Sequence, residues 1–165
     1  MKAYTIKEVK KCMSALLIGG AFDDFLISEG SITTFCTWTV DGSWQRDFAD
    51  PDHEDPASER RLAAWKDVRK IFLELIKGKR TPLAFKMVFV LPPDAQEDLV
   101  RDAGLAMDTE NIFGLYINLT FRDGRLLLTT GTSLKTFSMD RSVDEAWDAY
   151  VARFFTAQNI ELEKY

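Results

Sequence analysis

Histidine and cysteine are scarce in this chain of 165 residues, which contains one histidine and two cysteines. A zinc site needs three or four clustered histidine or cysteine ligands, and the sequence contains no such cluster. A chain of this length buries roughly 68–70% of its unfolded surface on folding, so it needs no disulfide to be stable. We therefore expect Cys12 and Cys36 to be reduced thiols that pack in the interior.

Long hydrophobic runs are also missing. The longest, such as 87–91, are far shorter than the ~20 apolar residues that a membrane-spanning helix requires. In the opening segment, 1–20, lysines interrupt every candidate apolar core of a signal peptide. The sequence thus predicts a cytoplasmic protein that does not associate with a membrane.

The signatures of common enzyme classes are absent as well. The sequence has no G-x-S-x-G nucleophile motif, no G-x-G-x-x-G dinucleotide motif and no phosphate-binding P-loop. His53 lies in the acidic segment DPDHED, 50–55, which fails the EF-hand pattern because the glycine is missing and Arg61 stands at the twelfth position. A histidine in a polar loop is a poor general base, since catalysis needs fixed geometry. We predict no catalytic residue, no cofactor and no specific metal.

Acidic residues outnumber basic ones by 26 to 21, which gives a formal net charge of −5. This balance argues against a protein that binds nucleic acid over its whole surface, but it permits a local basic patch. The segment 41–59 holds seven acids and one base, whereas 60–80 holds eight bases and two acids. Such a contrast is typical either of a docking surface for a charged partner or of a helix whose flanking charges suit its dipole.

Periodic apolar residues predict four helices and six strands. The predicted helices cover 5–19, 58–77, 92–104 and 142–154, and capping boxes open the first at Thr5 and the last at Ser142. The predicted strands cover 31–40, 43–48, 83–91, 112–121, 125–130 and 134–139, with turns at 41–42, 122–124 and 131–132.

The order of these elements predicts the fold class. Strands cluster instead of alternating one for one with helices, and several pairs are joined by hairpin turns. We therefore predict an α+β fold with a mainly antiparallel sheet of five to six strands and amphipathic helices packed on one face. No linker or repeat divides the sequence, so 1–165 is predicted to form a single globular domain.

If the helices cover one face of the sheet, polar side chains gather on the other. The alternation of the strands assigns six residues to this candidate binding surface: Thr33, Thr37, Thr39, Asn118, Thr120 and Lys135. Such a surface suits a peptide, a sugar or another subunit. Threonine is also common on any solvated sheet face, so the pattern does not require a ligand.

A basic cluster follows the second predicted helix. It comprises Lys77, Lys79, Arg80 and Lys86, which form a candidate anion patch beside Gly78. No aromatic residues are interleaved with these cations, as binding of a single strand would require. The hydroxyl-rich segment 129–135 offers a second place for an anion, although an ordinary hairpin explains it equally well.

Several strings resemble an uncharacterised family of small cytoplasmic proteins from clostridial Firmicutes, a domain of unknown function. They are spread over most of the chain: MKAYTIKEVK at 1–10, SITTF at 31–35, LIKGKRTPLAFK at 75–86, TTGTSLKTF at 129–137 and DEAWD at 144–148. The resemblance implies a bacterial cytoplasmic protein. It assigns no activity, cofactor or functional residue.

The interpretation that the sequence favours is a non-enzymatic cytoplasmic binding domain, with a protein partner or a second copy of itself as ligand. Two alternatives remain open. One is a small enzyme whose carboxylate, lysine and threonine residues converge only in three dimensions, because such sites leave no local motif. The other is a phosphate-binding or RNA-binding protein that uses the basic residues between 77 and 86, although nucleic acid is the less expected partner.

Overall fold

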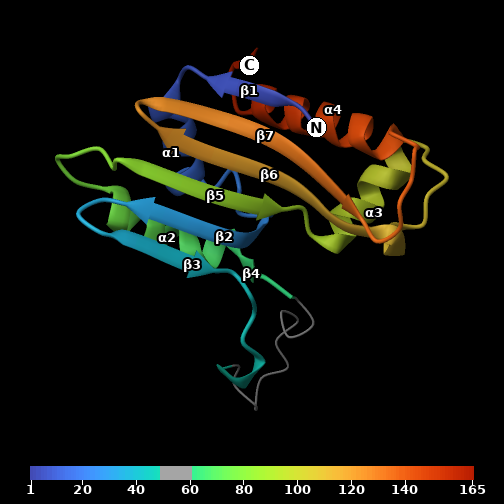
Figure 1. Ribbon diagram of the computed structural model, residues 1–165, viewed down its shortest axis with the longest axis horizontal. Helices are drawn as coiled ribbons and strands as arrows, with labels where there is room; N and C mark the ends of the chain where they lie inside the picture. Colours follow the sequence, from blue (N-terminus) through green and yellow to red (C-terminus); the bar gives the residue numbers. More distant parts are fainter. Residues whose placement is uncertain (49–60) are drawn as a thin grey trace.

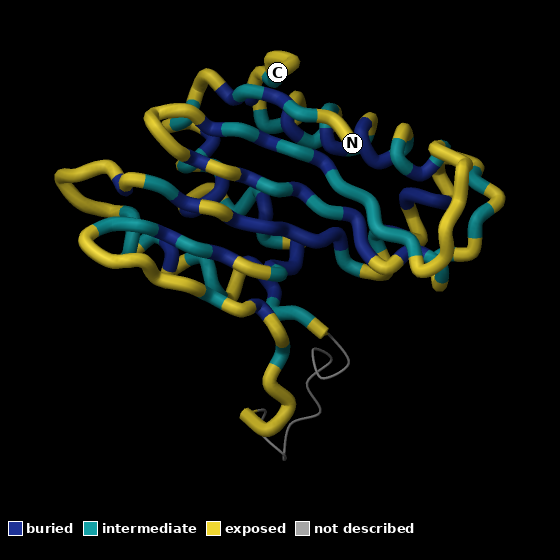
Figure 2. Tube along the Cα trace, in the orientation of Figure 1, coloured by how far each residue is buried: buried dark blue, intermediate teal, exposed yellow. Residues whose placement is uncertain are grey.

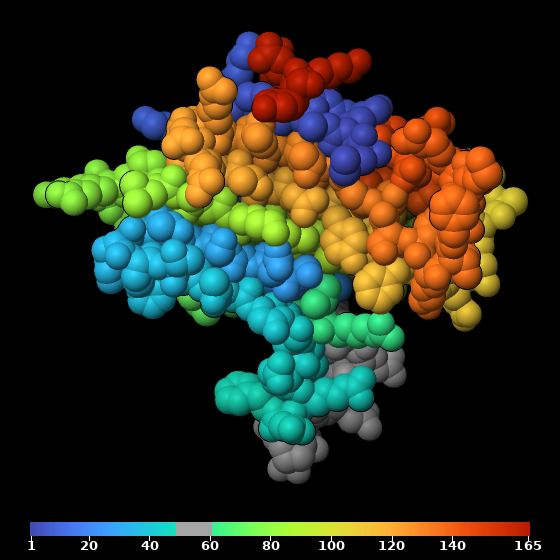
Figure 3. Space-filling view, in the orientation of Figure 1, coloured from blue at the N-terminus to red at the C-terminus, as the bar shows by residue number. Residues whose placement is uncertain are grey.

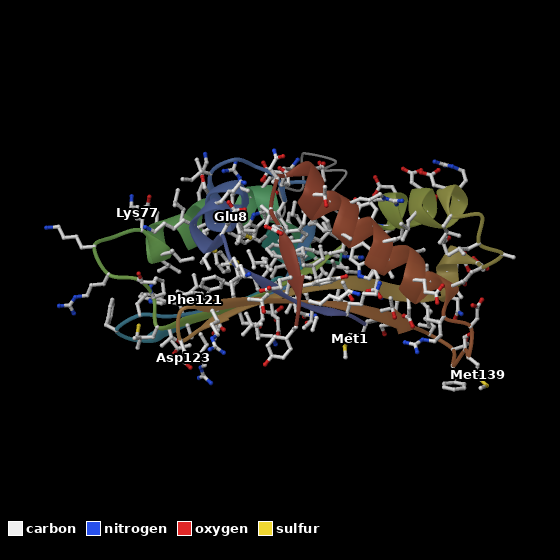
Figure 4. The ribbon with its side chains drawn as sticks, turned by 90° about the horizontal axis from the view of Figure 1, so that it is seen from above. Met1, Glu8, Lys77, Phe121, Asp123 and Met139 are labelled. Atoms are coloured by element: carbon white, nitrogen blue, oxygen red, sulfur yellow. The ribbon has the colours of Figure 1, made fainter. Side chains whose placement is uncertain are left out.

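The computed structural model describes residues 1–48 and 61–165, which form an antiparallel sheet with helices on one of its faces (Figures 1 and 4). His53 and the rest of the acidic segment 49–60 lie outside the described residues. The helices are α1 (Val9–Leu17), α2 (Trp65–Ile76), α3 (Pro93–Asp102) and α4 (Ser142–Ala157). The strands are β1 (Ala3–Ile6), β2 (Leu26–Thr33), β3 (Thr37–Asp41), β4 (Ala63–Ala64), β5 (Ala84–Val90), β6 (Ile112–Arg122), β7 (Arg125–Leu134) and β8 (Leu162–Lys164).

The strand order is β3-β2-β5-β6-β7-β1-β8, with β4 paired to β2 beside β3, and every pairing is antiparallel. The predicted α+β class and antiparallel sheet are therefore confirmed. The predicted count of five to six strands is wrong, because the sheet has eight. Three of these, β1, β4 and β8, have only two to four residues, which is too short for an alternating pattern to be recognised.

Apolar side chains from the helices and from alternate strand positions form the core. Phe85, Met87 and Phe89 of β5 face the helices, and the rings of Phe22 and Trp65 each lie 5.0 Å from that of Phe89. Figure 2 shows the burial along the strands and the exposure of the loops at both ends of the sheet. We call the surface on the other side of the sheet, which the helices leave uncovered, the open face.

The first predicted helix begins too early. Residues Ala3–Ile6 form β1, which pairs with β7 and β8, and α1 starts only at Val9. Glu8 is the residue before the helix, and no side-chain hydrogen bond caps it. Pairing with two strands outweighs the local capping signal, since tertiary contacts routinely override propensity.

The predicted strand 31–40 is a hairpin. It consists of the end of β2, a turn at 34–36 in which the amide of Thr34 donates to the carbonyl of Cys36 over 2.9 Å, and β3. The predicted turn at Asp41-Gly42 is therefore wrong. There the chain runs on along β2, and the Gly42 amide donates to the Ser28 carbonyl. The predicted strand 43–48 ends instead in a 3-10 turn at Arg46–Phe48.

The predicted turn at 131–132 is also wrong. β7 continues through Gly131 to Leu134, and 135–139 contains no strand. Gly131 lies opposite Tyr116 of β6, whose Cβ would be 3.6 Å from a Cβ added at that glycine. This distance is an ordinary contact, and the pairing of β6 with β7 continues through Gly131 without interruption.

Candidate functional site

The strand register places the predicted threonines and asparagine on the open face. Thr33 pairs directly with Thr37, and their hydroxyls share a hydrogen bond of 3.0 Å, so both side chains point to the same side. Thr39 lies on that side too, because it follows Thr37 by two residues on β3. Asn118 and Thr120 do so because their neighbours along β6 are buried in the core. Lys135 stands apart, since it follows the end of β7 in an exposed turn.

Carboxylates, a lysine and hydroxyls do meet on the open face, around a shallow pocket of ≈ 640 Å³. Glu29 of β2 pairs across the strands with Asp41 of β3 and forms an ion pair with Lys86 of β5. The Ser43 amide donates to the Asp41 carboxylate over 2.9 Å, and the hydrogen bonds from Ser43 lower the pKa of Asp41. The lowered pKa keeps Asp41 ionised at neutral pH, so it adds a negative charge beside the Glu29–Lys86 ion pair.

The predicted anion patch divides into two parts. Lys77, Lys79 and Arg80 lie exposed in the loop between α2 and β5, which projects at one end of the sheet (Figure 3). Lys86 lies on the open face, in its ion pair with Glu29. α2 ends at Ile76, because Lys77 is already extended and Gly78 has a φ of 148°.

Two aromatic residues complete the loop part of this patch. Phe35 lies at the tip of the β2–β3 hairpin and Trp38 follows on β3, with ring centroids 6.1 Å apart at an interplanar angle of 88°. The hairpin is held beside the α2–β5 loop because the Leu83 amide donates to the Thr33 carbonyl over 2.9 Å. Sequence reasoning missed this pair, because it sought aromatic residues within the basic segment and not on a hairpin that the fold brings beside it.

These five residues, Phe35, Trp38, Lys77, Lys79 and Arg80, line one pocket of ≈ 700 Å³, which we call the basic-aromatic corner. Phe35 is 92% exposed and Trp38 40%, and Leu83 beside them is 69% exposed. Exposed apolar groups gathered at one place are typical of a binding site.

The charges of the corner are mostly uncompensated. Glu74, an acid that lines the pocket, forms an ion pair of 2.6 Å with Lys77. Within 1–48 and 61–165, no ion pair involves Lys79 or Arg80. Among the residues described, the corner thus presents two cations without an ion pair next to exposed aromatic rings, which suits a ligand that is both anionic and aromatic.

The other predicted features lead elsewhere. In the segment 129–135, the hydroxyls of Thr130 and Thr132 donate to the carboxylates of Asp148 and Asp144, so acids occupy the place predicted for an anion. Cys12 is buried as expected, but Cys36 is exposed at the hairpin tip. In the part of the chain that the structure describes, no three histidine, cysteine or acidic side chains are placed to hold a metal ion.

Comparisons with known proteins give the family but no activity. The fold is α+β with an antiparallel sheet, and the surface carries an exposed corner of cations and aromatic rings. The chain matches the family of unknown function DUF5721 over residues 15–163, and it belongs to that family. No curated protein and no solved structure matches it. None of the helices described has the length and apolar character needed to cross a membrane.

Proposed function

We propose that this protein binds single-stranded nucleic acid, RNA or DNA, at the basic-aromatic corner. The observation that carries the proposal is the position of Phe35 and Trp38 against Lys77, Lys79 and Arg80 around one pocket. Proteins that bind single strands combine aromatic side chains, on which bases stack, with cations that contact the phosphates. Both requirements meet here in exposed side chains.

The aromatic half of the corner supports stacking. Phe35 meets Trp38 edge to face and is otherwise in solvent, so its ring faces are accessible to a flat ligand. Stacking on an aromatic side chain stabilises a bound base by about 1–3 kcal/mol. A base that covers Phe35 also removes an apolar surface from water, which adds to the affinity.

The electrostatics support a polyanion at this end in spite of the net charge. At the opposite end of the sheet, 93–111 and 135–145 together hold nine acidic and three basic residues. A strand that approaches is repelled there and attracted by Lys79 and Arg80, so the protein's own field orients it. The net charge of −5 therefore restricts binding to one end without preventing it.

An acidic protein segment is the competing ligand, because it would also satisfy the cations. It carries no flat aromatic unit beside each charge, so it would leave the exposed face of Phe35 unstacked. The proposal keeps the protein non-enzymatic and cytoplasmic, as the sequence predicts, and replaces a protein partner by nucleic acid.

The test is fluorescence anisotropy with labelled RNA and DNA single strands of about 12 nucleotides at ~50 mM salt. We expect both Phe35→Ala and the double variant Lys79→Gln/Arg80→Gln to weaken binding about tenfold or more, and added salt to weaken the wild type steeply. The ratio of the RNA and DNA affinities identifies the preferred strand.

Matched controls come from the opposite end. Phe137→Ala removes a ring that is 93% exposed, and Arg101→Gln/Arg141→Gln removes two surface cations, so neither change should alter the affinity. The proposal is overturned if neither strand binds, if the corner variants bind as well as these controls, or if poly-glutamate displaces the strand as well as an unlabelled strand does.

A further inference from the structure

We infer that a bound strand continues from the basic-aromatic corner across the end of the open face to Arg122 and Arg125. This inference rests on the proposed function and extends it from one nucleotide unit to a track. Figure 4 shows Lys77 on the helix side and Asp123 on the open side of the same end of the molecule, with Met139 at the other end. The corner and the two arginines that flank Asp123 therefore share this end.

The strand register defines the track. Thr37 pairs with Thr33, Thr33 with Ala84, Ala84 with Arg122, and Arg122 with Arg125. These five positions form one row across five strands. They lie on the open face, since the buried neighbours of the last four point toward the helices and Thr37 shares the orientation of Thr33. The row begins at the hairpin that carries Phe35. Because Trp38 and the pocket lie on the helix side, a bound strand passes around the tip of this hairpin from the corner to the row.

The chemistry of the row suits a phosphate backbone. Arg122 and Arg125 are exposed, and among the residues described neither takes part in an ion pair. Arginine binds phosphate through several donors in a fixed geometry. Thr33 and Thr37 supply hydroxyls at the other end of the row, and the small side chain of Ala84 leaves the path between them open.

The neighbouring charges keep a strand on this row. Further along the open face, Glu29 pairs with Asp41, and these carboxylates repel phosphate. Lys86 stands between the row and the acids, but its ammonium group is held by Glu29. The arginine row is thus the part of the open face where the exposed charge is positive.

The length of the row sets the size of the site. Five positions on neighbouring strands span four intervals of about 4.8 Å, or roughly 19 Å. Stacked nucleotides rise about 3.4 Å each along one strand, so the row accommodates about five, near the lower end of the ~4–16 nucleotides that one such domain covers.

The test compares labelled strands of about 3 and about 12 nucleotides with the wild type and with Arg122→Gln/Arg125→Gln. For the longer strand we expect the double variant to bind about tenfold more weakly, and the slope of log K against log salt to fall by about 1.4, or ~0.7 for each lost contact. The shorter strand, which the corner alone holds, should bind both proteins equally.

The variants separate the two proposals. Arg101→Gln/Arg141→Gln removes the same charge from the acidic end and should leave the affinity and slope of the longer strand unchanged. If the longer strand keeps its slope in Arg122→Gln/Arg125→Gln, or if both strands bind the wild type equally tightly, the track is refuted while the corner stands. If neither strand binds the wild type, the proposed function itself is refuted.

Discussion

The hydroxyl of Thr130 donates a hydrogen bond to the carboxylate of Asp148, and both residues are buried between β7 and α4. Asp148 is 5% exposed, so this hydroxyl replaces part of the water that an ionised carboxylate would otherwise bind. One turn earlier on α4, Asp144 accepts from Thr132 in the same way. Two threonines on one side of β7 thus fix the position of α4 along the sheet.

Replacing Thr130 by valine should destabilise the fold by about 2–4 kcal/mol, because it leaves the buried Asp148 carboxylate without this donor. Thr132→Val is the matched control. Its partner Asp144 is partly exposed and can turn to water, so the loss should stay below about 1 kcal/mol. Urea unfolding of the three proteins measures both values, and equal losses would contradict the prediction.

Gly30 of β2 should not tolerate a side chain, because a Cβ at this position would overlap with the ring of the fully buried Phe72. We expect Gly30→Ala to cost about 1–3 kcal/mol of the free energy of unfolding. In a Phe72→Leu background the same change should cost less, since the smaller side chain vacates the space. Additive losses in the double variant would show that the ring is not the obstacle.

The two cysteines should differ in reactivity. Cys36 is exposed at the hairpin tip, whereas burial raises the pKa of the Cys12 thiol to about 12 and withdraws it from solvent. A thiol reagent at pH 8 should therefore label one cysteine in the folded protein and two in urea. Peptide mapping that finds rapid labelling of Cys12 in the native state would contradict the structure.

Stability should also fall at alkaline pH because of Cys12. The pKa of the Cys12 thiol rises from 9.0 to about 12 on folding. Its contribution to the free energy of unfolding is therefore fully present below pH 9 and is lost as the pH rises through about 12. Between pH 9 and 10 the unfolded state loses its proton while the folded state keeps it, which costs about 1 kcal/mol. Cys12→Ala should lack this part of the decline, and identical pH profiles would refute the assignment.

The sequence was most informative where strands are long and central. β5 and β6 alternate over seven and eleven residues, and their predicted ranges match the structure closely. The threonines of the predicted strand 31–40 lie on one face even though that strand is a hairpin. The turn has three residues, so Thr37 comes to lie opposite Thr33 and keeps its orientation.

The basic-aromatic corner was beyond sequence reasoning for a physical reason. Phe35 and the loop that carries Lys79 are distant in sequence, and only the pairing of β2 with β5 brings them together. No local periodicity records such a pairing. A signal was present in Phe35, inside the turn at 34–36, and in Trp38 just after it, since exposed rings on a short polar hairpin have no place in a core.

The position of β1 between β7 and β8 affects how this protein folds during synthesis. Tyr4 pairs with Leu128 on one side and with Lys164 on the other, and both partners come much later in the sequence. Contacts so remote in sequence slow folding, because a long loop must close before they stabilise anything. On the ribosome, β1 therefore waits with both edges unpaired until β7 and β8 have emerged, and for that period it is open to pairing with another nascent chain.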